Sequence, residues 1–172
     1  MSFREGDFIE IREGLIFDVK GLVHPLNRVI AFVRHVPSPV GDRERGGLRY
    51  RKVYDLGERF TILRKSYPQY LVYDPIIGEE LIEVPIEQVV HHYQPVCKLT
   101  ELQACSNLDL LERKALDFTD FICDSAHIPR DKVGVSGSIL VGLASSSSDL
   151  DLVVYGVENA LQGDSIVIHK SK

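Results

Sequence analysis

Hydrophobic and polar residues alternate with a period close to two in the first part of the chain. Three segments between Asp7 and His35 follow this pattern, DFIEI, GLIFDVKGLV and NRVIAFVRHV, and the turn-like clusters REG and HPLN separate them. Side chains of a strand point alternately to opposite faces, so the pattern predicts three short antiparallel strands. The polar segment PSPVGDRERGG follows, and its prolines and glycines predict a mobile loop.

Capping residues predict the next helix. Asp55 precedes LGERFTILRK and Glu58 stands three residues after it, which is the spacing of a capping box. A short helix is therefore predicted there, ending before Pro68, and a strand is predicted at Tyr70–Tyr73.

Two prolines bracket the segment IEQVVHHY. Pro85 precedes it, and proline is tolerated in the first turn of a helix, whereas Pro95 follows it and cannot continue one. The segment is therefore predicted to be a helix. Residues 1–95 together are predicted to form a β-rich α+β module.

The remaining residues, 96–172, are predicted to form a second module. Val96–Ser106 has weak periodicity and is interpreted as the joint between the modules, and Asn107 is the predicted cap of the next helix. Strands are predicted at Val133–Ser136 and at Leu150–Tyr155, with a helix between them. The apolar stripe of the helix after Asn107 repeats at three and four residues and comprises Leu108, Leu111, Ala115, Phe118 and Ile122.

Composition bounds the class of protein. The 172 residues are 44% hydrophobic and 26% charged, which suits one globular domain or two small ones. No run approaches the roughly 20 apolar residues that a membrane helix needs, and acids stand where a signal peptide would be basic and then apolar. Cys97, Cys105 and Cys123 form no CxxC pair, so a cytoplasmic protein is predicted. A net charge of −5 argues against nonspecific coating of nucleic acid.

Two acids interrupt the apolar strand that begins at Leu150. Asp149 and Asp151 would point to the same side of this strand, with Leu150 and Leu152 on the other. Neighbouring carboxylates repel each other, and a divalent cation such as Mg²⁺ relieves that repulsion. A metal site is therefore predicted here, and the alternative is a solvated strand start on an exposed edge.

Gly137 and Ser138 stand where a strand is predicted to pass into a helix. Backbone N–H groups at such a point lack intrahelical partners and favour an anion, and glycine lets the anion approach closely. A phosphate-binding turn and an acidic pair on neighbouring elements together indicate that a nucleoside triphosphate binds here with Mg²⁺. A simple turn at Gly137 and an ordinary cap at Ser138 are compatible with this role.

The glycine-serine pair and the following DLD of Asp149–Asp151 resemble the signature of the DNA polymerase β nucleotidyltransferase superfamily. The resemblance covers roughly Leu108 to Tyr155, and the β-rich front half more faintly resembles the partner module of uncharacterised predicted nucleotidyltransferases from archaea. It implies transfer of a nucleoside monophosphate from a triphosphate to a hydroxyl of RNA, DNA, protein or a small molecule. Asp149 and Asp151 would hold two Mg²⁺ or Mn²⁺ ions, and Gly137 with Ser138 would hold the triphosphate.

The superfamily normally adds a third carboxylate on a later neighbouring strand. Glu158 lies too close to the preceding strand for this role, and Asp164 precedes SIVIH without standing inside it. Three interpretations stay open: the chain is part of something longer, another subunit of an oligomer completes the site, or the module binds nucleotide or RNA without efficient turnover.

Other motifs are given a weaker functional interpretation. GVSGS around Ser136 nearly matches the nucleophile elbow of hydrolases, with His169 downstream, but its fifth position is Ser138. No lysine follows the glycines as a P-loop requires. His91, His92, Cys97 and Cys105 lack zinc-finger spacing, and Ser145–Ser148 is interpreted as a flexible connector whose hydroxyls could touch a phosphate.

One basic cluster follows the third strand. It is diluted by two acids, so a solvated loop is its ordinary interpretation. A contact with RNA or DNA is the alternative, because Tyr50 and Tyr54 could stack on bases. The cluster comprises Arg43, Arg45, Arg49, Arg51 and Lys52.

Overall fold

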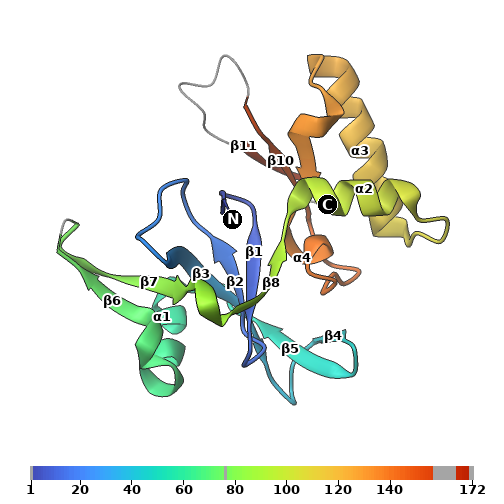
Figure 1. Cartoon of the computed structure of the whole chain (residues 1–172). Helices are drawn as coiled ribbons and strands as arrows, with labels where there is room; N and C mark the ends of the chain where they lie inside the picture. Colours follow the sequence, from blue (N-terminus) through green and yellow to red (C-terminus); the bar gives the residue numbers. More distant parts are fainter. Residues whose placement is uncertain (1, 76, 157–165, 171–172) are drawn as a thin grey trace. The chain divides into compact units, whose positions relative to one another are not determined.

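The computed structural model describes residues 2–75, 77–156 and the backbone of 166–170. The chain divides into two compact units, residues 1–92 (unit 1) and 93–172 (unit 2). Both units combine strands and helices, which confirms the predicted α+β class (Figure 1). Within the described ranges, no helix is long and apolar enough to cross a membrane.

Unit 1 is built on a curled antiparallel sheet. Its first strands are β1 (Phe8–Ile11), β2 (Ile16–Val19) and β3 (Arg28–Pro37), which confirm the three predicted strands. β1 pairs with β2 and β2 pairs with β3, each time antiparallel. The long strand β3 also pairs with β5 and β7 at its two ends, so it organises the whole unit.

The segment predicted to be a loop, residues 37–47, ends in the first strand and the turn of a hairpin, so the loop prediction was wrong for residues 43–45. β4 (Arg43–Arg45) and β5 (Leu48–Lys52) pair antiparallel across the two-residue turn of Gly46 and Gly47. Both glycines have positive φ, 57° and 79°, as a tight hairpin turn requires. The glycines thus mark the turn of a hairpin, and the arginines around them belong to its strands.

The next helix and strands follow the sequence signals. α1 (Leu56–Ser66) is capped by Asp55, whose Oδ1 accepts a hydrogen bond from the backbone N–H of Glu58 at 2.7 Å. A 3₁₀ turn, η1 (Pro68–Tyr70), leads into β6 (Leu71–Asp74), which confirms the predicted helix and strand. β6 pairs antiparallel with β7 (Glu79–Pro85).

The helix predicted after Pro85 is absent from this described segment. A single 3₁₀ turn, η2 (Ile86–Gln88), leads instead into strand β8 (Val89–Tyr93), which lies beside β1 in the sheet. Adjacent β-branched valines at the start of β8 favour a strand, and pairing with β1 satisfies its backbone. Pro95 then begins helix α2 (Pro95–Ala104) where it was predicted to end one, so the predicted joint is largely helical.

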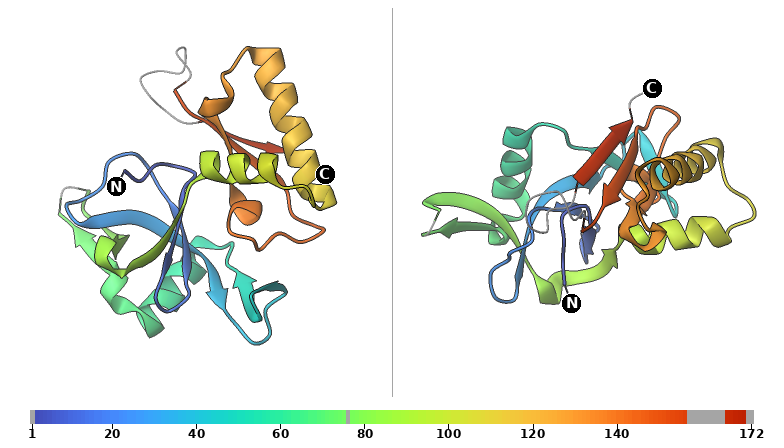
Figure 2. Two further views of the ribbon diagram at one scale, coloured as in Figure 1. Left: turned by 45° about the vertical axis from the view of Figure 1, so that its right-hand side comes forward. Right: turned by 90° about the horizontal axis from the view of Figure 1, so that it is seen from above.

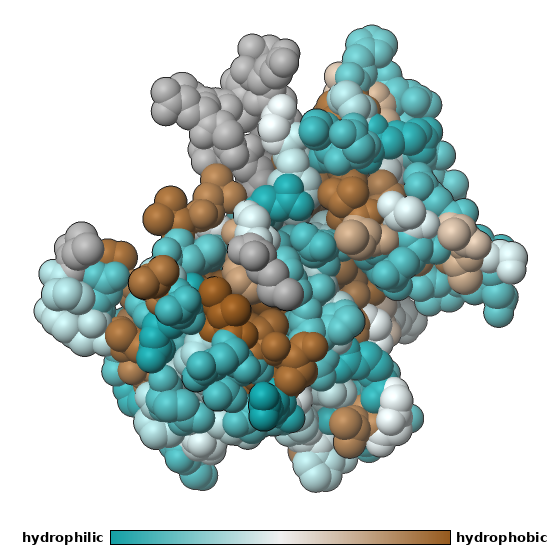
Figure 3. All heavy atoms as spheres, viewed as in Figure 1, coloured by the Kyte–Doolittle hydropathy of each residue, from teal (hydrophilic) through white to brown (hydrophobic). Residues whose placement is uncertain are grey.

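The core of unit 1 lies under the curled sheet. α1 packs against β3 and β6 and closes one side of this core. Apolar side chains also reach the surface of the unit, among them Leu22, Val23 and Leu26 in the loop between β2 and β3 (Figure 3). The fully buried members of the core include Ile9, Leu15, Phe17, Val29, Val33, Val53, Leu63, Ile82 and Val84.

Unit 2 pairs helices with a three-stranded antiparallel sheet. The sheet has the order β11-β10-β9, formed by β9 (Val133–Val135), β10 (Leu150–Val154) and β11 (Ile166–Lys170). α2 and α3 (Leu110–Ala126) pack against this sheet (Figure 2). Turn η3 (Arg130–Lys132) leads into β9, and the short helix α4 (Gly137–Leu140) follows it.

The predicted stripe of α3 forms the core of unit 2, but its predicted cap was wrong. All five stripe residues, from Leu108 to Ile122, belong to one cluster with Leu99, Leu102 and Leu152. Asp109 is the cap instead of Asn107, because its side chain accepts from the N–H of Glu112 while the Glu112 carboxylate accepts from the N–H of Asp109. This is a complete capping box.

Candidate functional site

Gly137 and Asp151, which the sequence predicts as two halves of one site, are in direct contact. The backbone N–H of Ser136 donates to the carbonyl oxygen of Asp151 at 2.7 Å, so the chain beyond β9 runs against β10. A Cβ atom at Gly137 would lie 1.8 Å from Oδ2 of Asp151, which is far inside van der Waals contact. Gly137 also has φ +62°, a conformation that side chains rarely adopt. Glycine is therefore required here for two independent reasons.

The structure places one of the two acids on strand β10. Leu150 and Leu152 are buried in the core of unit 2, whereas Asp149 is exposed and Asp151 is half-buried. Asp151 belongs to β10, so its side chain lies on the side of the strand opposite the leucines, whereas Asp149 directly precedes the strand. β10 is the middle strand of the sheet, so Asp151 does not lie on an exposed edge. The alternative of a solvated edge is wrong for Asp151.

Helix α4 follows β9, as predicted, but it is only four residues long. Its dipole is correspondingly small, so an anion would rely on the individual N–H groups of its first turn. Ser136 occupies the cap position, and its side chain makes no capping hydrogen bond to those groups. Ser138 is buried, and its carbonyl accepts from the N–H of Leu143 at 2.9 Å. Ser138 would therefore contribute its backbone N–H more readily than its hydroxyl.

The four serines form a hydrogen-bonded turn in the segment that connects α4 to β10. The Ser148 hydroxyl accepts from the N–H of Ser145 at 2.9 Å, and the N–H of Ser148 donates to the carbonyl of Ser145 at 2.9 Å. Ser148 is buried and directly precedes Asp149. This turn therefore fixes where the acidic pair begins. Sequence reasoning missed the role of Ser148, although its position before the first acid was the available signal.

A third carboxylate does not join the pair in the described part of the chain. No group of three or more histidine, cysteine, aspartate or glutamate side chains gathers there. β11 pairs with β10 and places the backbone of His169 opposite Asp151, and the sequence of β11 contains no acid. Glu158 and Asp164 lie outside the described residues.

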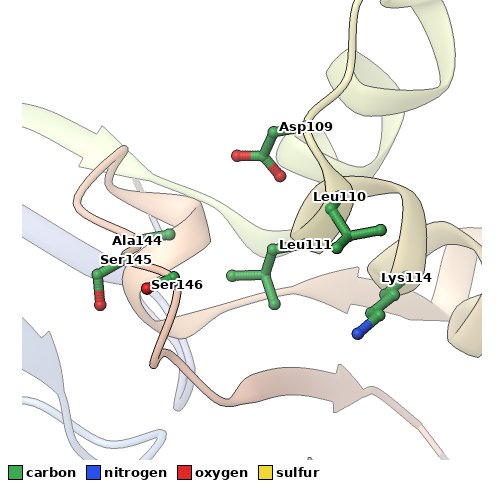
Figure 4. Close-up of a pocket in the computed structure, with 7 residues that line it drawn as sticks. All are labelled: Asp109, Leu110, Leu111, Lys114, Ala144, Ser145 and Ser146. Carbon is green, nitrogen blue, oxygen red and sulfur yellow. The ribbon is translucent and has the colours of Figure 1, made fainter.

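A cavity of about 400 Å³ lies beside the serine turn, between that turn and the start of α3 (Figure 4). Figure 4 shows Leu111 directed from the start of α3 toward the segment of Ala144, Ser145 and Ser146. Asp109, Leu110 and Lys114 complete the lining, so the cavity combines apolar side chains, a cation, a carboxylate and hydroxyls. Such a lining suits a ligand with an apolar body and polar edges.

The competing motifs find less support in the structure. Ser136 is buried, and β9 belongs to an antiparallel sheet, whereas a nucleophile elbow exposes its serine above a parallel one. Nε2 of His92 lies 2.8 Å from Oδ2 of the buried Asp7, which gives this histidine a structural partner. Cys97, Cys105 and Cys123 are free thiols.

Comparison with known proteins identifies an archaeal relative. The chain is 34% identical over 165 residues to the uncharacterized protein MJ1086 of Methanocaldococcus jannaschii, and the match covers 91% of this chain. The chain spans about half the length of that relative, 48%. The predicted similarity to uncharacterised archaeal proteins is confirmed. No protein-family model and no solved structure matches the chain.

Proposed function

We propose that unit 2 is a nucleotidyltransferase core that transfers a nucleoside monophosphate from a triphosphate to a hydroxyl acceptor. The contact between Gly137 and the carboxylate of Asp151 carries this proposal. It joins a turn with N–H groups suited to phosphate to a strand with an acidic pair suited to a divalent cation. A nucleotide with its bound cation needs both at once.

The residues of the site divide the work between phosphate and metal. Asp149 and Asp151 supply hard oxygen ligands, and two carboxylates plus phosphate oxygens and water suit Mg²⁺ or Mn²⁺. Such a cation would neutralise charge on the attacking and leaving oxygens. The N–H groups of Gly137 and Ser138 would hold the triphosphate, and the serine turn with its buried Ser148 would keep Asp149 in position.

In the proposed reaction, one phosphorus–oxygen bond forms and another breaks. The acceptor oxygen bonds to the α-phosphorus, and the bond from that phosphorus to the bridging oxygen breaks. Pyrophosphate leaves with the electron pair, and the acceptor hydroxyl releases its proton to solvent. The cavity beside Ser145 and Ser146 is wide enough to hold a base or an acceptor group.

Pyrophosphate release tests the proposal. The protein is incubated with Mg²⁺ or Mn²⁺ and each of ATP, CTP, GTP and UTP, with RNA, DNA and the protein itself as acceptors. We expect release with at least one nucleotide, and a loss of about 100-fold or more in Asp149→Asn and Asp151→Asn, because each removes a metal ligand.

Asp117→Asn is the matched control. Asp117 is an exposed acid on α3, so its substitution changes the charge of unit 2 equally without touching the acidic pair. Pyrophosphate release that Asp149→Asn and Asp151→Asn leave unchanged would refute the assignment of these residues.

A second candidate is a module of the same fold that binds nucleotide or RNA without turnover. It is favoured by the acidic pair having no third carboxylate in the described part of the chain. Calorimetry separates the two candidates. Nucleotide binding that needs Mg²⁺, with no pyrophosphate from any acceptor, would favour the binding module, whereas release of pyrophosphate would exclude it.

A further inference from the structure

We infer that unit 1 binds single-stranded RNA at Tyr54. The inference goes beyond the proposed nucleotidyl transfer and does not depend on it, because it concerns only unit 1. The evidence is an exposed aromatic ring with two cations close to it, a local excess of positive charge around it, and a second exposed tyrosine in the same unit that lacks these features.

Two cations lie close to the exposed ring of Tyr54. Its exposed fraction is 66%, and it follows β5 directly after Val53, whose N–H donates to the carbonyl of Arg34 at 2.8 Å. This hydrogen bond fixes the chain beside β3. The guanidinium carbon of Arg34 lies 5.7 Å from the ring centroid, and Nζ of Lys52 lies 5.1 Å from it. The ring is therefore held in place while most of its surface faces solvent.

Positive charge gathers around this ring in an otherwise acidic chain. From Arg34 to Tyr54 the sequence holds six arginine and lysine residues and two acids, although the chain as a whole carries −5. Arg45 and Arg51 are neutralised by Glu10 and Glu58. The basic stretch also includes the two cations close to Tyr54 and the exposed Arg49 on β5. A base stacked on Tyr54 would place its flanking phosphates near these cations.

The acid that follows Tyr54 in sequence is already engaged. Asp55 accepts a hydrogen bond from the N–H of Glu58 and caps α1, so its negative charge faces the positive end of that helix. Asp55 therefore opposes a phosphate near the ring less than a free carboxylate would.

Tyr73 provides an internal comparison. Its exposed fraction is 65%, almost equal to that of Tyr54, but it lies opposite Glu80 in the register of β6 and β7 and precedes Asp74. Acids would repel the phosphates of a nucleic acid. Exposure of a tyrosine alone thus does not favour a base-stacking site, whereas an exposed tyrosine with cations close to its ring does.

The chemistry favours an unpaired strand. An exposed ring binds the face of a base, and in a duplex those faces are stacked on their neighbours and out of reach. Each stacked base contributes roughly 1–3 kcal/mol without requiring a particular sequence. RNA presents unpaired bases in loops and at ends, so single-stranded RNA is the occupant to which the inference commits.

Fluorescence anisotropy of the full chain with a labelled single-stranded RNA of mixed sequence tests this inference. We expect Tyr54→Ala to weaken binding about 5- to 100-fold, the range given by loss of one stacked base. Tyr54→Phe should bind within about twofold of the wild type because the ring remains. Arg34→Gln and Lys52→Gln should each lower the slope of log K against log salt by about 0.7.

Tyr73→Ala is the matched control, and it should leave the RNA affinity unchanged. Circular dichroism should show the same fold for both alanine variants, since both side chains are exposed. Three results would overturn the inference: no RNA binding by the wild type, equal losses in Tyr54→Ala and Tyr73→Ala, or binding of single-stranded DNA, duplex RNA or an acidic peptide as tight as that of single-stranded RNA.

Discussion

Gly137 lies where the backbone after β9 meets the side chain of Asp151. Substituting this one residue therefore tests the geometry of the site. Gly156 has nearly the same φ, +63° against +62°, but no heavy atom of the described residues lies within 4 Å of its Cβ position. Alanine at Gly156 should cost about 1–2 kcal/mol of unfolding free energy through backbone strain alone. Alanine at Gly137 should cost more, because it also displaces the Asp151 carboxylate.

Urea unfolding of the two alanine variants measures this difference. Gly137→Ala should unfold at a lower urea concentration than Gly156→Ala and should also lose metal-dependent nucleotide binding. Equal midpoints and intact nucleotide binding would show that the contact with Asp151 does not constrain the site.

His35 predicts a pH dependence of stability. It is fully buried on β3, and neither ring nitrogen has a hydrogen-bond partner within the described residues. Burial, together with the positive charges of Lys52 and Arg43, lowers the pKa of His35 from 6.5 to about 3. The unfolded state therefore binds more protons than the native state between those two values. The His35 contribution is fully present above pH 6.5 and is lost as the pH falls toward 3.

Chemical denaturation between pH 4 and pH 8 measures this contribution. Below pH 6.5, the unfolding free energy of the wild type should fall by up to about 1.4 kcal/mol per pH unit more than that of His35→Gln. Above pH 6.5, the unfolding free energies of the two proteins should change with pH in parallel. His127→Asn is the control, since His127 is exposed and asparagine tolerates its left-handed conformation. A His35→Gln profile parallel to that of the wild type throughout would contradict this role for His35.

At the scale of elements, the start of α3 allows a test of how much a capping box contributes to the unfolding free energy. Asp109 and Glu112 each accept a hydrogen bond from the other's backbone N–H. Asp109→Ala should lower the unfolding free energy by about 1 kcal/mol, and Asp109→Ser should retain most of it because serine also caps. Asn107→Ala should have little effect, since Asn107 is not the cap. Thermal unfolding of the three variants checks this order, and a larger loss in Asn107→Ala would reverse the assignment.

Elements with strong local signals were predictable from the sequence, and those set by pairing partners were not. Alternation gave β1 to β3, and the stripe of α3 was recognised because its period is long and regular. β8 was mistaken for a helix because its flanking prolines outweighed its β-branched residues, and the strand depends on pairing with β1. The hairpin of β4 and β5 was missed because its many charges resemble those of a loop.

At the scale of the whole molecule, each unit has its own core. The largest clusters of buried residues stay within residues 1–92 or within 93–172, as the division of the chain also does. A chain of residues 1–92 should therefore unfold cooperatively by itself. Chemical denaturation with circular dichroism and amide exchange checks this expectation. A fragment without a cooperative transition would show that unit 1 needs unit 2 to fold.

The residues of the candidate site were predictable from the sequence, but the contacts that bring them together were not. Residue types, the strand alternation and the resemblance to the nucleotidyltransferase signature identified Gly137, Ser138, Asp149 and Asp151 as parts of one predicted site. The contact of Gly137 with Asp151 and the closed serine turn needed the structure, because both depend on how β9 and β10 pair. The third carboxylate was not found by either route in the described residues, since an acid distant in sequence carries no local signal.

The central claim is that the turn and the acidic pair act as one site for a nucleotide and its cation. Electron paramagnetic resonance of free Mn²⁺ tests it directly, with and without a non-hydrolysable nucleoside triphosphate. Two carboxylates alone should hold Mn²⁺ weakly, and the nucleotide should strengthen binding at least about tenfold by adding phosphate oxygens as ligands. Asp151→Asn should abolish this gain and Asp117→Asn should keep it. Mn²⁺ binding that the nucleotide does not change, or that survives Asp151→Asn, would contradict the account.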